Sequence, residues 1–224
     1  MHYRALHSWD LDCAAARAVQ TVLAAQVRTV GAPRRVRLVA GVDLALAGAD
    51  GVGAVVILRY PELTPVEEVT VRAPLAWPYV PGLLSFRELP VLLQAWARIE
   101  HVPDLILVDG SGLIHPRRCG LACHLGLLLD RPTIGCAKGL LCGVAGELGP
   151  ARGDAAPVVL AGERVGVALR TRAAVKPLYV SVGHGLSLAA AVRWTLACAG
   201  RYRLPEPVRR AHALAGAAAR AAAQ

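Results

Sequence analysis

The chain has 224 residues, a formal net charge of +9 and a hydrophobic fraction of 55%. This length suits one compact domain, here residues 1–224, and the hydrophobic fraction is ample for a buried core. The excess of basic residues indicates a polyanionic partner or surface. Charge alone does not distinguish nucleic acid from a membrane.

Simple patterns argue against secretion, a membrane span and structural zinc. Residues 1–7 lack the apolar core of a secretory signal, and no uninterrupted apolar run approaches the ~18 residues of a membrane span. The six cysteines form no CxxC pair and have no histidine at a zinc-ligand spacing, which argues against structural zinc, and we expect Cys119 and Cys123, one helical turn apart, to be small core residues. Thiols without a secretion signal fit a reducing compartment. We therefore expect a cytoplasmic protein with no membrane span, and the short basic tail favours a monomer.

The first third of the chain predicts a helix followed by three strands. Residues 11–29 have helical apolar spacing with Asp10 or Asp12 as a cap, and we treat residues 1–34 as a helical extension. Strand-like runs follow, separated by turn-prone segments, at residues 36–46, 52–60 and 65–73. Two tight connections in succession favour an antiparallel meander.

Helices and short buried strands then alternate. Leu89, Leu92, Leu93, Trp96 and Ile99 recur at helical spacing, and residues 104–108 form an apolar run typical of a strand buried on both faces. The remaining predictions are helices at 118–129 and 188–199, strands at 132–136, 163–170 and 177–182, a surface loop at 143–157, and a flexible or helical Ala/Arg-rich tail at 213–224.

Three carboxylates occupy positions that suit a divalent cation. Asp43 and Asp109 each end an apolar run, and Glu88 opens a helical pattern, so they can meet at one edge of a sheet. Together without a cation they would repel one another and raise one another's pKa values, whereas a hard cation prefers oxygen ligands. Singly, Asp109 is typical of a turn and Glu88 of a first helical turn; their joint placement indicates a metal site.

The order of elements predicts an α/β fold of the ribonuclease H-like type. In that fold an antiparallel meander leads into parallel strands of one mixed sheet flanked by helices. Carboxylates stand on the first strand, on the helix after the third strand and on the fourth strand. Asp43, Glu88 and Asp109 occupy these three places. A basic chain with such an acidic site suggests a metal-dependent enzyme acting on nucleic acid.

The segment Trp77–Glu88, with sequence WPYVPGLLSFRE, resembles the signature of the endonuclease V family. Four further segments support the resemblance in the family's order, from about residue 3 to residue 212. They are Gly41–Asp43, Val108–Arg118, Pro132–Lys138 and Tyr202–His212.

The resemblance implies a repair nuclease that recognises deoxyinosine in DNA. Its members hydrolyse the second phosphodiester bond on the 3′ side of the hypoxanthine nucleotide, leaving 3′-hydroxyl and 5′-phosphate ends, with Mg²⁺ or, as a substitute, Mn²⁺. By position, Asp43 and Asp109 would bind the metal directly, and Glu88 directly or through water. Lys138 and His212 would lie close to the scissile phosphate as further catalytic residues. Metal count stays open.

The resemblance also assigns a wedge to the loop Pro78–Tyr79–Val80–Pro81. Prolines stiffen both ends of this loop, and Tyr79 offers a flat aromatic face that would fill the gap left by a flipped base. The alternative is a rigid turn with Tyr79 packed on the core.

Glycines near the signature predict a base pocket. Without a Cβ they let backbone groups approach hypoxanthine and read its O6 acceptor and N1–H donor, whose polarity is opposite in adenine. The predicted lining is Gly82, Leu84, Gly110, Gly112 and His115. Three departures from the family pattern bear on lesion recognition: Ser111, Cys123 and Gly139–Leu140.

Two other functions compete with the deoxyinosine 3′-endonuclease. An inosine-specific endoribonuclease would use the same chemistry, because the discriminating contact is to a 2′-hydroxyl. A non-catalytic binder of inosine or of branched DNA is the third hypothesis, and an intact acidic triad beside phosphate argues against it.

Overall fold

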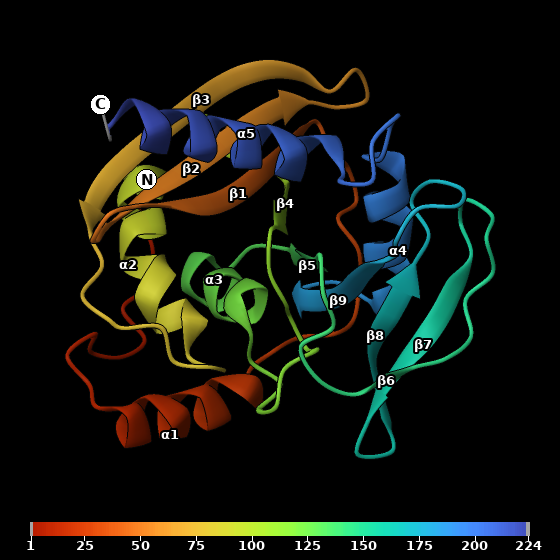
Figure 1. Cartoon of the computed structure of the whole chain (residues 1–224), viewed down its shortest axis with the longest axis horizontal. Helices are drawn as coiled ribbons and strands as arrows, with labels where there is room; N and C mark the ends of the chain where they lie inside the picture. The colour runs from red at the N-terminus through yellow and green to blue at the C-terminus, as the bar shows by residue number, and fades with distance from the viewer. Residues whose placement is uncertain (1, 223–224) are drawn as a thin grey trace.

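A computed structural model describes residues 2–222 as one mixed β-sheet with helices on both faces (Figure 1). The strand order in the sheet is β3-β2-β1-β4-β5-β9-β8-β7-β6. The predicted α/β class with a mixed sheet is thereby confirmed. No helix within residues 2–222 has both the length and the apolarity that a membrane span needs.

The first strands form the predicted antiparallel meander, and the next two run parallel to its first strand. The meander comprises β1 (Leu38–Ala47), β2 (Asp50–Arg59) and β3 (Thr64–Pro74). Strands β4 (Leu105–Val108) and β5 (Thr133–Ala137) add in parallel beside β1. Beyond β5 the sheet becomes antiparallel again through β9 (Leu178–His184), β8 (Glu163–Leu169), β7 (Ala155–Leu160) and β6 (Val144–Ala145).

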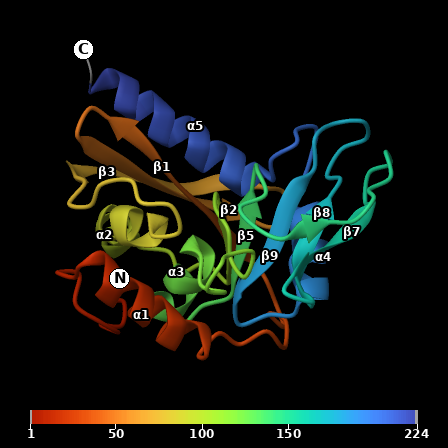
Figure 2. The same cartoon turned by 60° about the horizontal axis from the view of Figure 1, so that its bottom comes forward.

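The helices divide between the two faces of the sheet (Figure 2). Helix α5 (Glu206–Ala221) lies across β1 and β2 on one face, and α4 (Leu188–Ala197) shares the hydrophobic core of that face. Helices α2 (Leu84–Ala97) and α3 (Leu121–Leu129) cover the other face, and α1 (Cys13–Ala24) packs outside them against α3.

Alternation along the central strands separates the two cores. Val39, Leu105 and Leu107 belong to the core under α4 and α5, whereas Ala40, Ile106 and Val108 belong to the core under α2 and α3. This follows from the period of two in a strand, and it explains why β4 is wholly apolar. The same alternation directs Asp43 and Asp109, at odd positions, toward the side of α5.

Several boundaries differ from the sequence prediction for local reasons. Helix α2 begins at Leu84, just after Gly82 (φ +77°), so Glu88 lies in the second turn and not at the start. Helix α3 begins at Leu121 and not at residue 118, because Arg118 has a left-handed backbone (φ +54°) that cannot continue a helix. Asp43 lies inside the ten-residue strand β1 and not at its end.

Two further segments differ from their prediction. The predicted surface loop at 143–157 contains β6 and the start of β7, a short antiparallel pair at the edge of the sheet. Helix α1 ends at Ala24, earlier than expected. The tail continues α5 as far as Ala221, while residues 223–224 lie outside the described residues.

The N-terminal segment is packed against the rest of the structure. The amide of Arg4 donates to the Leu128 carbonyl at 2.7 Å, and His7 Nε2 lies 2.7 Å from Nε2 of the buried His124. Leu23 of α1 shares a small core with Cys119 and Cys123. Both cysteines are buried and free, as expected, and burial raises the pKa of Cys119 to about 12.

Gly41 sets how closely α5 approaches β1. A Cβ at this position would lie 2.0 Å from the carbonyl oxygen of Pro207 and 2.8 Å from the amide of Val208. Both atoms belong to the backbone, which cannot swing aside as a side chain can. A larger residue would therefore push the start of α5 away from the sheet.

Gly41→Ala is expected to lower the free energy of unfolding by about 1–3 kcal/mol, the usual range for overpacking. It should also lower any activity that depends on His212, since that residue is carried by α5. Gly200→Ala is the matched control, because a Cβ there meets nothing within 4 Å. Thermal and urea unfolding of the two variants measure the difference, and equal stability would contradict the close approach.

Candidate active site

Parallel pairing of β1 and β4 brings the two aspartates together. Val42 is the partner of Val108, and the amide of Asp109 donates to the Val42 carbonyl at 3.1 Å. Asp43 and Asp109 follow these paired residues, so they become neighbours across the sheet. Because β4 ends at Val108 while β1 continues to Ala47, Asp109 is the first residue beyond the shorter strand and faces Asp43 from the neighbouring chain segment.

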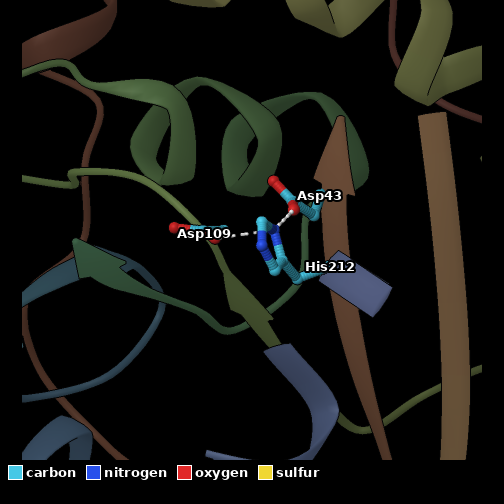
Figure 3. Close-up of side chains that lie close together, drawn as sticks. All are labelled: Asp43, Asp109 and His212. Atoms are coloured by element: carbon cyan, nitrogen blue, oxygen red, sulfur yellow. Dashed lines mark hydrogen bonds and ion pairs between the residues drawn. The ribbon is translucent and has the colours of Figure 1, made fainter. Parts of the chain in front are cut away.

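Helix α5 places His212 over the aspartate pair (Figure 3). His212 Nδ1 lies 2.6 Å from Asp43 Oδ2 and 3.9 Å from Asp109 Oδ2. The Asp43 side chain is 11% exposed and the His212 side chain is 56% exposed, so the acids lie at the base of the site and the imidazole lies at its rim. The close approach at Gly41 makes this contact possible.

Lys138, directly after β5, completes the charged cluster. Its ammonium group donates to Asp109 Oδ2 at 2.5 Å and lies 3.4 Å from His212 Nδ1. β5 is the parallel neighbour of β4, so Lys138 reaches the same end of the sheet as Asp109. The ammonium group of Lys138 and the imidazole of His212 thus both contact the pair of adjacent carboxylates.

Three side chains have the spacing of a metal site. One ligand atom from each of Asp43, Asp109 and His212 lies within 4.8 Å of the others. The sequence had predicted Glu88 as the third ligand, but Glu88 lies outside this set, on α2. It borders a smaller hollow together with Leu44 and Tyr79.

Asp43 and Glu88 are held in an environment that opposes their ionisation. Burial, followed by the charge of Asp109, raises the pKa of Asp43, while the hydrogen bond from His212 acts in the opposite direction. Burial, followed by the charges of Asp43 and Asp109, raises the pKa of Glu88 to about 8. A divalent cation would remove this repulsion, so the electrostatics favour cation binding.

A cavity of about 350 Å³ lies beside the charged cluster. Asp109 and Lys138 form the part of its wall that faces the cluster. The other walls come from the loop before α2, the start of α2, the loop between β4 and α3, and the start of α3. The residues of these walls include Tyr79, Gly82, Leu84, Ser85, Gly110, His115, Gly120 and Leu121.

The Endonuclease V family model matches residues 21–213, which is most of the chain. Endonuclease V of Roseiflexus castenholzii is 49% identical over 209 residues, which cover 93% of this chain and 94% of that protein.

The chain belongs to the endonuclease V family.

Solved structures of the family agree with this fold. The crystal structure of Endonuclease V from Streptomyces avermitilis matches with a TM-score of 0.92 at 42% identity, covering 97% of both chains. Ciona intestinalis Endonuclease V, solved in complex with a 24-mer DNA containing an inosine followed by a ribo-adenosine, matches with a TM-score of 0.82 at 27% identity. This match covers 93% of the present chain and 98% of the Ciona chain. The chain is thus a nuclease of this family.

Most of the base-pocket residues expected for an endonuclease V lie on the cavity wall. Gly82, Leu84, Gly110 and His115 line it. Gly112 has another role, because a Cβ there would lie 2.1 Å from the carbonyl oxygen of Val182 in β9. The absence of a side chain at Gly112 lets the loop between β4 and α3 pack closely against the sheet.

The loop that the endonuclease V resemblance assigns as a wedge projects from the molecule. Tyr79 is 66% exposed, so the alternative in which it packs on the core is wrong. Pro78 and Pro81 are also exposed, while Trp77 and Val80 anchor the loop against a small core formed with Phe86. Arg87 adds a hydrogen bond to the Trp77 carbonyl at 2.9 Å.

Sequence reasoning missed several residues of this endonuclease V cavity. Gln20 reaches it from α1, and Ser85, Leu121, Ala137 and Leu141 also line it. Gln20 is buried in α1, whose other buried residues are apolar. Because a buried amide needs hydrogen-bond partners, a glutamine among the apolar positions of this helix was the available signal. The others are small or apolar and carry no such signal.

Glu88→Gln is expected to stabilise the metal-free protein increasingly as pH rises. Burial raises the pKa of Glu88 to about 8 from the 4.5 of the free side chain, so between these values the folded protein holds a proton that the unfolded chain releases. That carboxyl therefore destabilises the fold as pH rises through this window, and glutamine cannot ionise.

Melting temperatures in EDTA at pH 5 and pH 8 measure this effect. The melting temperature of the variant should exceed that of the wild type at pH 8 and approach it at pH 5. Glu62→Gln, at an exposed position, is the control for loss of one negative charge. Parallel pH dependence of wild type and Glu88→Gln would contradict the raised pKa.

Proposed function

We propose that this protein is a metal-dependent endonuclease that recognises deoxyinosine in DNA. It hydrolyses the second phosphodiester bond on the 3′ side of the lesion and leaves 3′-hydroxyl and 5′-phosphate ends. One observation carries the proposal: Asp109 and Lys138 belong both to the charged cluster and to the wall of the cavity. A base held in the cavity would therefore bring the DNA strand that carries it to Asp43 and Asp109. The related Ciona protein was crystallised with inosine-containing DNA, which agrees with this substrate.

The donor set suits a hard divalent cation. Two carboxylates stand side by side, both Asp43 and Glu88 have raised pKa values, and a bound cation would relieve their repulsion. We assign Asp43 and Asp109 as the residues that hold Mg²⁺, or Mn²⁺ as a substitute, with Glu88 reaching it directly or through water. When bound, the cation would supply Lewis-acid stabilisation of charge on the phosphodiester.

The remaining charged residues act on the phosphate and on protons. Lys138 provides a point charge that offsets negative charge on the phosphate oxygens during hydrolysis. Its ammonium group is paired with Asp109, and a cation held by Asp109 would leave Lys138 free to contact the phosphate. His212 stands at the exposed rim beside Asp43, where it can hold or donate a proton at Nδ1.

Recognition of hypoxanthine rests on backbone polarity in the cavity. Gly120 and Leu121 line the cavity at the start of α3, where the first N–H groups have no acceptors within the helix. The amide of Gly120 already donates to the Gly112 carbonyl at 3.0 Å, so the donor that this helix start offers to a base is the amide of Leu121. Such a donor suits the O6 acceptor of hypoxanthine and opposes the amino group of adenine. The exposed Tyr79, between two prolines, would fill the space that the extruded base leaves in the duplex.

Cleavage of a labelled duplex with one deoxyinosine tests the proposal. In Mg²⁺ we expect one nick at the second phosphodiester bond 3′ of the lesion, with none in EDTA and none in an undamaged duplex. Asp43→Asn should lower the rate by about a hundredfold or more, since it removes a charged group at the reacting centre. Normal lesion-dependent cleavage by Asp43→Asn would refute the assignment.

An inosine-specific endoribonuclease is the second candidate. The Ciona complex contains a ribo-adenosine directly after the inosine, so a ribonucleotide at that position is compatible with the family's site. Rates on matched DNA and RNA oligonucleotides separate the two functions. A faster rate on RNA, with little cleavage of DNA, would favour this candidate.

Tyr79→Ala is expected to weaken binding to lesion-containing duplex by about tenfold while cation affinity is unchanged, because an aromatic stacking contact of about 1–3 kcal/mol is lost. Tyr3→Ala is the control, since Tyr3 is also exposed, at 44%, and lies outside the loop. Fluorescence anisotropy measures duplex binding, and cation-induced shifts in melting temperature measure cation affinity. Unchanged duplex affinity for Tyr79→Ala would mean that the tyrosine is not a wedge.

A further inference from the structure

The carbonyl oxygen of Gly82 accepts two hydrogen bonds from one loop. The guanidinium of Arg117 donates to it at 2.7 Å, and His115 Nε2 lies at 3.0 Å. A carbonyl oxygen has two lone pairs, so both are used. This carbonyl is therefore not free to read a base, and its role is to hold the chain at the point where the loop 78–81 enters α2.

The partners of His115 fix which nitrogen carries the proton. Its Nδ1 accepts from the amide of Arg117 at 3.2 Å, so the proton of the neutral ring lies on Nε2 and points at Gly82. Both ring nitrogens are thus engaged within the protein. His115 forms part of the cavity wall, and neither nitrogen is left for a phosphate or a base.

Gln20 of α1 fixes the guanidinium of Arg117. Its Oε1 accepts from Arg117 Nε at 2.7 Å, and its Nε2 donates to the Cys119 carbonyl at 3.2 Å. Gln20 is 1% exposed, so its two polar ends have found protein partners in a dry setting, where loss of either bond is costly. A continuous chain of contacts runs from α1 through Arg117 to Gly82.

The backbone at Gly82 needs such support. It has φ +77°, and a Cβ there would lie 2.9 Å from the Arg117 guanidinium, so the side chain covers the glycine closely. Gly82 stands between the exposed tyrosine loop and the first turn of α2. Its orientation consequently sets both the direction of Tyr79 and the position of Leu84 on the cavity wall.

We propose that Gln20 and Arg117 are positioning residues that determine selectivity for the lesion base. They hold the Gly82 carbonyl and with it the shared border of the loop and the cavity. The selectivity part rests on the proposed function, because it takes the cavity as the base pocket. The alternative for Arg117, in a protein of net charge +9, is a direct contact to DNA phosphate.

Three substitutions separate positioning from phosphate contact. Gln20→Met keeps the length of the side chain, removes both of its hydrogen bonds and changes no charge. Arg117→Lys keeps the charge and loses the planar fork, whereas Arg117→Met loses both. Arg17→Met is the matched control, because Arg17 is an exposed arginine on α1 that lies close enough to Arg117 to contribute, after burial, to lowering its pKa.

Affinities for deoxyinosine-containing and matched undamaged duplex are measured in EDTA over a range of salt. We expect Gln20→Met and Arg117→Lys to reduce the ratio of the two affinities by about tenfold, the effect of one hydrogen bond. The slope of log affinity against log salt should be unchanged in both. In Mg²⁺ both should raise KM more than they lower kcat, and Arg17→Met should keep the wild-type ratio.

Amide hydrogen exchange gives a readout that needs no substrate. In Gln20→Met and Arg117→Lys, exchange at Tyr79, Val80 and Gly82–Leu84 should accelerate, while exchange in β4 and β5 stays at the wild-type rate. If the wild type showed no preference for deoxyinosine, the proposed function would fail, and the exchange result would still decide whether the two residues position the loop.

Other outcomes would overturn the inference. An equal loss of affinity for both duplexes in Arg117→Met, with a salt slope reduced by about one and wild-type behaviour of Gln20→Met, would make Arg117 a phosphate contact. Faster exchange throughout the protein in Gln20→Met would make Gln20 a general packing residue. Unchanged exchange at residues 79–84 would contradict the positioning role directly.

Discussion

The structure depends on holding two carboxylates next to each other at the end of a buried sheet. Pairing of Val42 with Val108 forces Asp43 and Asp109 together, and burial makes the charge of Asp43 costly to maintain beside that of Asp109. Neighbouring elements compensate with a lysine after β5 and a histidine on α5. The site is therefore poised for a cation, and the fold around it exists to bring compensating groups from distant parts of the chain.

The two faces of the sheet serve different tasks, and Asp109 and Lys138 link them. Asp43 and His212 lie on the side of α5, where charge and proton chemistry are concentrated. The cavity is built on the other side, from α1, α2 and α3. Asp109 and Lys138 belong to both, because they line the cavity and also contact each other and His212. A base in the cavity would therefore leave its DNA strand close to the acids.

The sequence predicted the parts of the fold that depend on local pattern. The meander and the apolar strand β4 follow from period and turn residues, and β1 to β5 lie where expected. Two things escaped it. The contact between His212 and Asp43 spans 169 residues and depends on the absence of a side chain at Gly41, which reads locally as an ordinary strand residue. The place of Glu88 in the second turn of α2 depends on the backbone of Gly82, a tertiary feature.

Helix α1 shows why such gaps matter for function. As a sequence it is an amphipathic helix at the start of the chain, and as a structure it sends a buried amide to the loop that borders the cavity. A buried amide with both ends bonded is rigid, because any motion leaves a donor or acceptor without a partner. The N-terminal helix thereby stiffens the loop 78–81, although Gln20 and Tyr79 are roughly sixty residues apart in the sequence. In this fold the chemistry is set by strand register, whereas recognition is set by side chains that reach across from a peripheral helix. Substitutions in α1 can therefore alter selectivity while leaving the acidic cluster intact.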